Sequence, residues 1–350
     1  MPISLKSRLK QAMRALLKTE SSPPTCGEIP AITPEEVKEA KTFFPLEKYF
    51  IFGHARSGTT LLTRLVRLHP QVHCNYQAHF FTRAPLLEKL VADEEVRMWF
   101  VRRSNRWNRG CDLSPVVLRS VSDFIMERDA RQAGKGTRGC LVGDKSPNSL
   151  LDGESVQLMT KIYPEARLIF IVRDGRDAIL SHRFQAFIDR AEYLSKEDLR
   201  IRQEFIDNPN SFYSGKRSLF SEKGLRQSAK GWAHNLVDTN SRASELLGER
   251  YYHLRYEDLL SNPLDEMTKL WSFLGVDPTV NGLKEAISSE LQQNPDADWQ
   301  EVKAAEIFGS LTKGKRGNWH DLFNFRDRQI FKEVAGETLI RWGYELNLEW

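Results

Sequence analysis

The feature that most constrains the fold is a short apolar run that leads through a loop of glycine, serine and threonine into a helix. Residues 49–53 read YFIFG, which predicts a buried strand. Residues 53–60 read GHARSGTT, and the helical pattern after them ends at His69-Pro70. In such a loop the backbone N–H groups that open the helix face an anion, and the helix dipole lies behind them. The segment therefore predicts a phosphate-binding strand–loop–helix.

The loop differs from the P-loop of nucleoside triphosphatases in the position of its cation. Gly53 and Gly58 keep the G-x4-G spacing, but Thr59 stands where that P-loop has lysine. The cation is instead Arg56, inside the loop. The missing lysine argues against an ATPase or kinase. A P-loop small-molecule kinase remains the alternative, and Asp144 is its one candidate Mg²⁺ ligand.

Further strands and helices predict the fold class. Apolar runs indicate strands at 71–75, 140–144, 166–174 and 251–258. Helical patterns fall at 178–189, 224–247, 263–274 and 326–342. Strands that are apolar on both faces and alternate with helices are typical of a buried parallel sheet. We expect an α/β protein, a three-layer fold with a central parallel sheet.

The chain divides by composition into an extension and one large domain. We expect a basic amphipathic extension and linker at 1–33 and a single domain at 34–350, with insertions at about 83–139 and 187–223. In the extension, Leu5, Leu9 and Met13 share a helical face among scattered lysines and arginines. This pattern suits peripheral contact with an anionic membrane as well as packing on the domain itself, and both interpretations stay open.

Composition narrows the function classes. The 350 residues carry a net charge of +4, which does not call for a nucleic-acid partner. The four cysteines form no CxxC pair, so neither a zinc site nor a disulfide framework is expected. The sequence has no run of eighteen apolar residues, and from the sequence we therefore expect no membrane-spanning helix. We expect a cytoplasmic protein; oligomeric state cannot be inferred.

Two further segments are candidates for binding anions. Arg173 ends the strand at 166–174, where ligands bind in open α/β sheets, and Ser181 follows eight residues later. A surface pair of Arg173 with Asp174 or Asp177 is the alternative. Residues 312–319 read TKGKRGNW, a strongly positive loop that is ordinarily just solvated.

With these three segments the chain resembles the PAPS-dependent sulfotransferases, where PAPS is 3′-phosphoadenosine 5′-phosphosulfate. The resemblance covers about 49–344 and is closest locally to the heparan sulfate, tyrosylprotein and bacterial types. The family's [KR]-S-G-T-T loop, its Arg and Ser eight apart and its R-K-G-x-x-G-D-W element follow one another in that order, and its Y-E-D-L segment, the fourth element, lies between the second and the third. Here Thr312 and Asn318 replace the arginine and aspartate of the third element.

The resemblance implies the residues that bind PAPS. In the family the first loop binds the 5′-phosphosulfate, and the second and third elements, here Arg173 with Ser181 and residues 312–319, bind the 3′-phosphate. The fourth element, the Y-E-D-L segment, helps to form the adenine pocket. These residues are Arg56, Ser57, Gly58, Thr59, Thr60, Arg173, Ser181, Lys313, Gly314 and Tyr256.

The resemblance also implies a reaction without a metal, in which positioning and electrostatic stabilisation carry catalysis. Arg56 is expected to stabilise the departing phosphate, and Lys145 in the family's D/E-K-[ST]-P element to assist it. A salt bridge between Lys145 and Asp144 is the structural alternative.

The catalytic base is where this sequence departs from the family. Gln77 occupies the position at which the heparan sulfate and tyrosylprotein sulfotransferases have a glutamate that deprotonates the acceptor. Pro147 occupies the position, two residues after the lysine, at which the cytosolic sulfotransferases have a histidine. His79 is therefore the candidate base, since an imidazole titrates near neutrality, and His54 and His182 are reserves. A structural role for His79 is equally open.

The resulting hypothesis is a PAPS-dependent sulfotransferase. It would transfer a sulfuryl group by in-line displacement to a hydroxyl or amine of a small-molecule, lipid or glycan acceptor. The alternatives are the small-molecule kinase and a non-catalytic PAPS-binding protein, which the replacements at Gln77 and Pro147 keep open.

Overall fold

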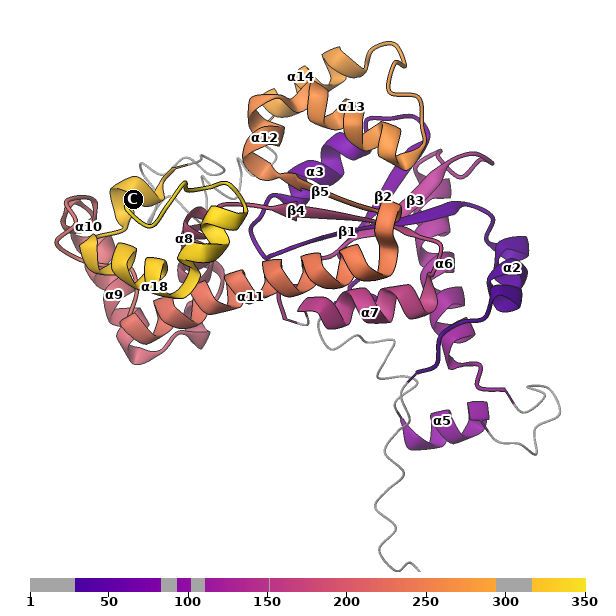
Figure 1. Ribbon diagram of the computed structural model, residues 1–350, viewed down its shortest axis with the longest axis horizontal. Coiled ribbons are helices and arrows are strands. Elements are labelled where there is room, and N and C mark those ends of the chain that lie inside the picture. Colours follow the sequence, from indigo (N-terminus) through magenta and orange to yellow (C-terminus); the bar gives the residue numbers. More distant parts are fainter. Residues whose placement is uncertain (1–28, 83–92, 102–110, 151, 294–316) are drawn as a thin grey trace, which may run out of the picture.

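The computed structural model describes residues 29–82, 93–101, 111–150, 152–293 and 317–350. Five parallel strands form one sheet in the order β2-β3-β1-β4-β5 (Figure 1). In chain order they are β1 (Glu47–Gly53), β2 (Val72–Tyr76), β3 (Leu141–Lys145), β4 (Arg167–Val172) and β5 (Tyr251–Arg255). The predicted parallel sheet is confirmed.

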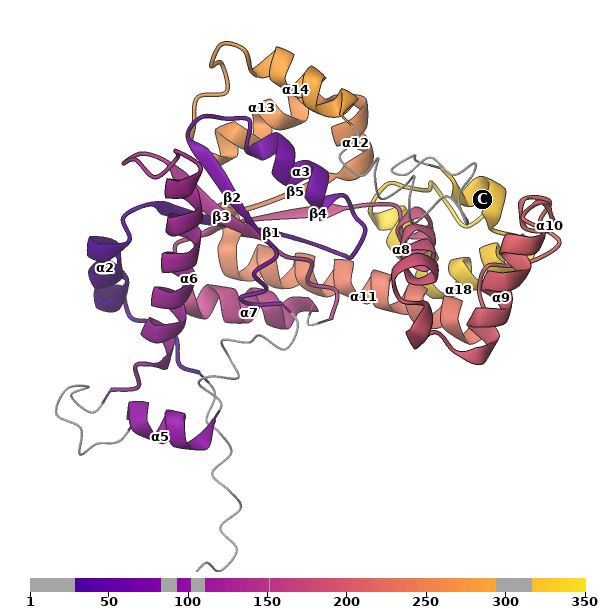
Figure 2. The same cartoon turned by 180° about the vertical axis from the view of Figure 1, so that it is seen from behind.

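Alternate residues of the central strand face two separate cores, as the pleat of a strand requires. Phe50 and Phe52 point into one core, and Tyr49 and Ile51 into the other. Helices cover both faces, so the sheet is the middle of three layers (Figures 1 and 2). The predicted three-layer architecture is confirmed.

Each face of the sheet has its own helices. One core contains side chains of α3 (Thr59–Val66), α12 (Tyr256–Ser261), α13 (Pro263–Leu274) and α14 (Leu283–Gln292). The opposite face is covered by α6 (Ser114–Gln132), α7 (Asp152–Ile162) and α11 (Glu222–Leu247).

The remaining elements lie at the ends of the sheet. Several gather where the C terminus lies (Figure 1): α8 (Gly175–Asp189), α9 (Lys196–Asp207), α10 (Asn210–Tyr213) and α18 (Phe325–Arg341). Short elements are η1 (Ala191–Tyr193), η2 (Gly248–Arg250) and α17 (Trp319–Leu322). Figure 2 shows α2 (Pro34–Phe43) beside α6, and α5 (Glu94–Val101) apart from the sheet.

The expected strands and helices agree with the structure to within three residues, but the last expected strand changes into a helix before its predicted end. The run at 251–258 was expected to be a single strand, but the strand ends at Arg255 and α12 begins at Tyr256. Glu257 and Asp258 then lie in the first turn of a helix, where the helix dipole favours negative charge.

The domain boundaries at 33/34 and the two insertions stay predictions. The N-terminal amphipathic segment lies mostly outside the described residues. Within the range taken as the first insertion, α6 buries Leu118 and Met126 in the main core. Among the helices that the structure describes, none is both long and apolar enough to span a bilayer.

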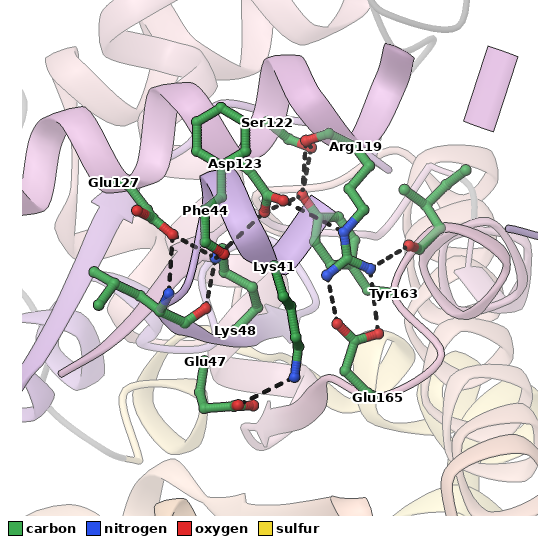
Figure 3. A network of polar contacts seen from close by, with 12 residues as sticks. Lys41, Phe44, Glu47, Lys48, Arg119, Ser122, Asp123, Glu127, Tyr163 and Glu165 are labelled. Atoms are coloured by element: carbon green, nitrogen blue, oxygen red, sulfur yellow. Dashed lines mark hydrogen bonds and ion pairs between the residues drawn. The ribbon is translucent and has the colours of Figure 1, made fainter. Parts of the chain in front are cut away.

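A buried charge network joins the start of β1 to α6 and to the turn before β4 (Figure 3). Lys48 Nζ lies 2.9 Å from Glu127 Oε1 and 3.4 Å from Asp123 Oδ1. Arg119 contacts Asp123 and pairs with Glu165. Removing one partner of such a network leaves a charge buried without its counter-ion, which costs more than the pair contributes.

We therefore expect Lys48→Met to lower the free energy of unfolding by about 3–5 kcal/mol, because Glu127 would lose its buried counter-ion. Urea denaturation measures this. The matched control is Lys41→Met, whose pair with Glu47 is partly exposed and contributes at most about 1 kcal/mol. Equal losses in the two variants would contradict the assignment.

Candidate active site

The expected site residues lie where neighbouring parallel strands end. Ile51 of β1 pairs in register with Lys145 of β3, and Gly53 pairs with Ile171 of β4. The loop after β1, the last residue of β3 and the turn after β4 therefore meet at one edge of the sheet. Ligands bind at this edge in open α/β folds.

The loop at 54–58 has the geometry of an anion-binding turn. The Ser57 N–H donates to His54 O at 3.0 Å, and Gly58 precedes α3 with a φ of 91°. Only glycine fits there, since a Cβ on residue 58 would lie 2.2 Å from Cδ2 of Tyr256. Tyr256 of the Y-E-D-L segment thus packs directly on the loop at 54–58.

The hydroxyl of Ser57 is the strongest indication of a ligand at this loop. Its Oγ is buried and has no hydrogen-bond partner among the described residues. A buried polar group without a partner is costly, and an absent ligand is one of the few explanations for it. An anion at the start of α3 would supply the missing acceptor. Thr59 is buried beside it, and Thr60 is exposed.

The first and second candidate anion-binding elements are in direct contact. Arg56 Nε donates to Ser181 Oγ at 3.1 Å, across 125 residues of sequence. Arg173 Nη1 donates to the carbonyl of Arg56 at 3.1 Å, and its guanidinium lies 4.8 Å from the ring centroid of Tyr256. Asp174, one of the surface partners considered for Arg173, is paired with Arg176 at 2.7 Å.

The third element is anchored to the same helix as Ser181. Asp177, near the start of α8, accepts from the N–H of Gly317 at 2.6 Å and of Trp319 at 3.1 Å. The Trp319 ring in turn lies 3.7 Å from the guanidinium of Arg176. Lys313 and Gly314 themselves lie outside the described residues.

Lys145 is buried at the end of β3 and faces the loop. Its Nζ donates to Thr60 Oγ1 at 3.4 Å. The adjacent Asp144 has its carboxylate turned to Asn75, Ser146 and the N–H of Ala78 instead. Burial lowers the pKa of Lys145 to about 8, and Arg56 acts in the same direction while Asp144 opposes it.

The segment after β2 is held in a strained conformation against β3. Gln77 and His79 have φ values of 50° and 54°, which non-glycine residues adopt at a cost of about 1–3 kcal/mol. Their N–H groups donate to Lys145 O at 2.7 Å and to Ser146 Oγ at 3.0 Å. Such strain is found where a segment must present particular side chains.

The histidines differ in their surroundings. His79 is half-buried, and its Nδ1 lies 2.6 Å from the hydroxyl of Thr82. Burial lowers the pKa of His54 to about 4, so its ring is neutral near pH 7. Burial also lowers the pKa of His182, and Arg190 and Arg56 add to that effect.

Sequence reasoning missed two carboxylates that assemble the site. Asp177 fixes the segment before α17, and Glu257 accepts from the N–H of Asp174 at 3.0 Å, which ties the turn after β4 to α12. Both lie near residues that were singled out, Arg173 and Tyr256; Asp177 is buried and Glu257 half-buried. An acidic residue within a cation-rich motif is the signal that would have found them.

In the part of the chain that the structure describes, no group of three His, Cys, Asp or Glu side chains is arranged to hold a metal ion. Cys74 and Cys140 are buried free thiols.

Comparison with known proteins points to one family. The family model described as "Sulfotransferase family" matches residues 49–279. A protein-tyrosine sulfotransferase of Drosophila melanogaster is 25% identical over 65% of this chain, which spans 38% of that protein. A putative protein-tyrosine sulfotransferase of Caenorhabditis briggsae is 22% identical over 82% of this chain and 85% of that one. The chain thus spans well under two thirds of the fly relative.

Among solved structures, the mouse sulfotransferase SULT7A1 complexed with PAP is similar, with 16% identity and a TM-score of 0.45. The similarity covers 87% of this chain and 89% of that chain.

The environment of Lys145 predicts how it titrates. We expect its side chain to be charged below about pH 8 and neutral above, because burial disfavours the charged form. NMR of protein with labelled lysine side chains measures this, and a Lys145→Gln variant assigns the signal. A titration near the ordinary value of about 10.4 would contradict the described burial.

Proposed function

Because the chain belongs to the sulfotransferase family, we propose that it transfers a sulfuryl group from PAPS to a hydroxyl or amine of an acceptor. The observation that carries the proposal is the contact between the two phosphate elements. Arg56 of the first loop donates to Ser181 of the second, and the buried Ser57 hydroxyl beside them lacks an acceptor. A bisphosphorylated nucleotide would engage both elements together.

The residues fit the nucleotide in charge as well as in position. The loop offers backbone N–H groups, the orphaned hydroxyl of Ser57 and the cation Arg56, which are the groups that bind phosphate at a helix start. Arg173 and the Tyr256 ring border the same region. The proposed PAPS-binding residues are Arg56, Ser57, Gly58, Thr59, Thr60, Arg173, Ser181, Tyr256, Lys313 and Gly314.

PAPS would supply the activated sulfuryl group, whose transfer leaves negative charge on the departing phosphate. Arg56 in the loop and the buried Lys145 would stabilise that charge, since a cation at a site shielded from water acts more strongly than one in solution. Because the pKa of Lys145 is lowered to about 8, its charge is largely retained near pH 7 and lost above pH 8.

His79 is the proposed base that removes the acceptor proton. Its backbone is fixed to Ser146, the residue after Lys145, and its ring contacts Thr82 through Nδ1. If Nδ1 carries the proton and donates it to Thr82, the basic nitrogen of the neutral ring is Nε2. Gln77, exposed on the same segment, would orient the acceptor through its amide.

The kinase alternative is disfavoured by the surroundings of its candidate Mg²⁺ ligand. The Asp144 carboxylate accepts from Asn75, Ser146 and the N–H of Ala78, and burial raises its pKa. It holds the segment after β2 and faces away from the ammonium of Lys145.

We propose a small molecule, lipid or glycan as the acceptor. The curated relatives are named for sulfation of protein tyrosine, so a protein hydroxyl belongs in the same acceptor screen.

The donor site is tested by isothermal titration with adenosine 3′,5′-bisphosphate. We expect binding by the wild type and a loss of about 10- to 100-fold in affinity for Arg173→Ala, the value of a charged hydrogen bond to phosphate. Arg226→Ala is the matched control, because that exposed arginine of α11 pairs with Glu222 of the same helix and with Glu333 of α18, outside the candidate site. No binding by the wild type, together with binding of ATP, would favour the kinase.

Turnover separates the enzyme from a non-catalytic binder. We expect Lys145→Met to lower kcat by about 10²- to 10³-fold while adenosine 3′,5′-bisphosphate still binds, because the cation would act on charge that develops during transfer. Labelled PAPS with the acceptor panel measures this. Tight nucleotide binding by the wild type without sulfuryl transfer to any acceptor would support the binder instead.

A further inference from the structure

Tyr76 is a large aromatic side chain at the carboxyl end of β2, and it remains 42% exposed although the strand before it is buried. Its position follows from the sheet register, in which Tyr76 and Lys145 are Cα partners on adjacent parallel strands. Side chains at paired positions of neighbouring strands point to the same face. The ring therefore lies beside the lysine that ends β3.

The ring is in contact with two cations. Lys145 Nζ lies 5.2 Å from the ring centroid, and the guanidinium carbon of Arg67 lies 5.0 Å from it. Both distances fall within the range in which a cation is attracted to an aromatic ring. Arg67 follows the end of α3, and its Nη2 forms an ion pair with Asp129 Oδ2 at 3.9 Å. This pair holds Arg67 beside the ring.

The carboxylate adjacent to Lys145 in sequence is hydrogen-bonded to other groups. Asp144 accepts from Asn75, Ser146 and Ala78, while the ammonium of Lys145 donates to the neutral hydroxyl of Thr60. The titratable or charged groups that act on the ammonium from the surrounding elements are Cys74 of β2, Asp144 of β3 and Arg56 of the loop.

We propose that Tyr76 is a positioning residue whose aromatic ring holds the ammonium group of Lys145 at the edge of the sheet and favours its charged form. The inference rests on the proposed function in so far as Lys145 acts on the transferred group. The contact itself belongs to the protein without any ligand, so it can be tested independently of turnover.

The test compares Tyr76→Leu with Tyr76→Phe. Leucine keeps apolar cover over Lys145 but removes the aromatic face, whereas phenylalanine keeps both. We expect the pKa of Lys145, followed by NMR of labelled lysine, to fall by about 0.5 to 1.5 in Tyr76→Leu and to stay unchanged in Tyr76→Phe. With an acceptor in hand, the alkaline limit of kcat/KM should move down by the same amount in Tyr76→Leu alone.

The control is Tyr193→Leu, a tyrosine that is 81% exposed on η1, and thermal unfolding verifies that each variant folds. Tyr76→Met serves as a second aliphatic replacement. An unchanged pKa of Lys145 in both aliphatic variants would overturn the inference. A raised pKa would also overturn it, because the ring would then act only by excluding water.

The two proposals fail in different ways. If the wild type shows no sulfuryl transfer but the pKa of Lys145 falls in Tyr76→Leu, the positioning role stands and the proposed function does not. If the wild type transfers sulfuryl groups but the pKa of Lys145 is unchanged in Tyr76→Leu, the proposed function stands and the positioning role does not.

Discussion

The parallel pairing of β1 with both β3 and β4 is the constraint on which the rest of the structure depends. It places the ends of three strands side by side, through the pairs Ile51–Lys145 and Gly53–Ile171. Parallel neighbours cannot be joined by a tight turn, so long crossovers carry the chain over the two faces and build both helical layers. The edge that results receives a cation from each of three separate segments, Arg56, Lys145 and Arg173. Such an edge suits a ligand that carries several negative charges.

Carboxylates around this edge are engaged by other groups, which preserves its positive character. Asp174 is bound by Arg176, and Asp144 by Asn75, Ser146 and a backbone N–H. Asp177 lies near Arg173, yet it accepts two N–H groups of the segment before α17. Asp144 and Asp177 therefore hold backbone in place beside Lys145 and Arg173. A polyanion that binds there meets fixed partners with little reorganisation.

Local patterns predicted most of the elements, whereas contacts between distant segments could not be predicted. The apolar runs located the strands, because a buried parallel strand must be apolar on both faces. The strand predicted to run to Asp258 ends at Arg255, since YED suits the first turn of a helix as well as the end of a strand. Spacing brought Arg173 and Ser181 into one element, but that Ser181 meets Arg56 depends on the relative placement of α8 and the loop. No periodicity encodes such a placement.

The strained segment at 77–79 is fixed by contacts of its own backbone. The N–H groups of Gln77 and His79 are held by the carbonyl of Lys145 and the hydroxyl of Ser146, so the backbone geometry does not depend on the side chain at 77. A glutamate here would add a negative charge to the exposed side of this segment, and the glutamine adds none. Residue 76, which precedes this segment, has a side chain that reaches the ammonium of Lys145, with its ring centroid 5.2 Å from Nζ.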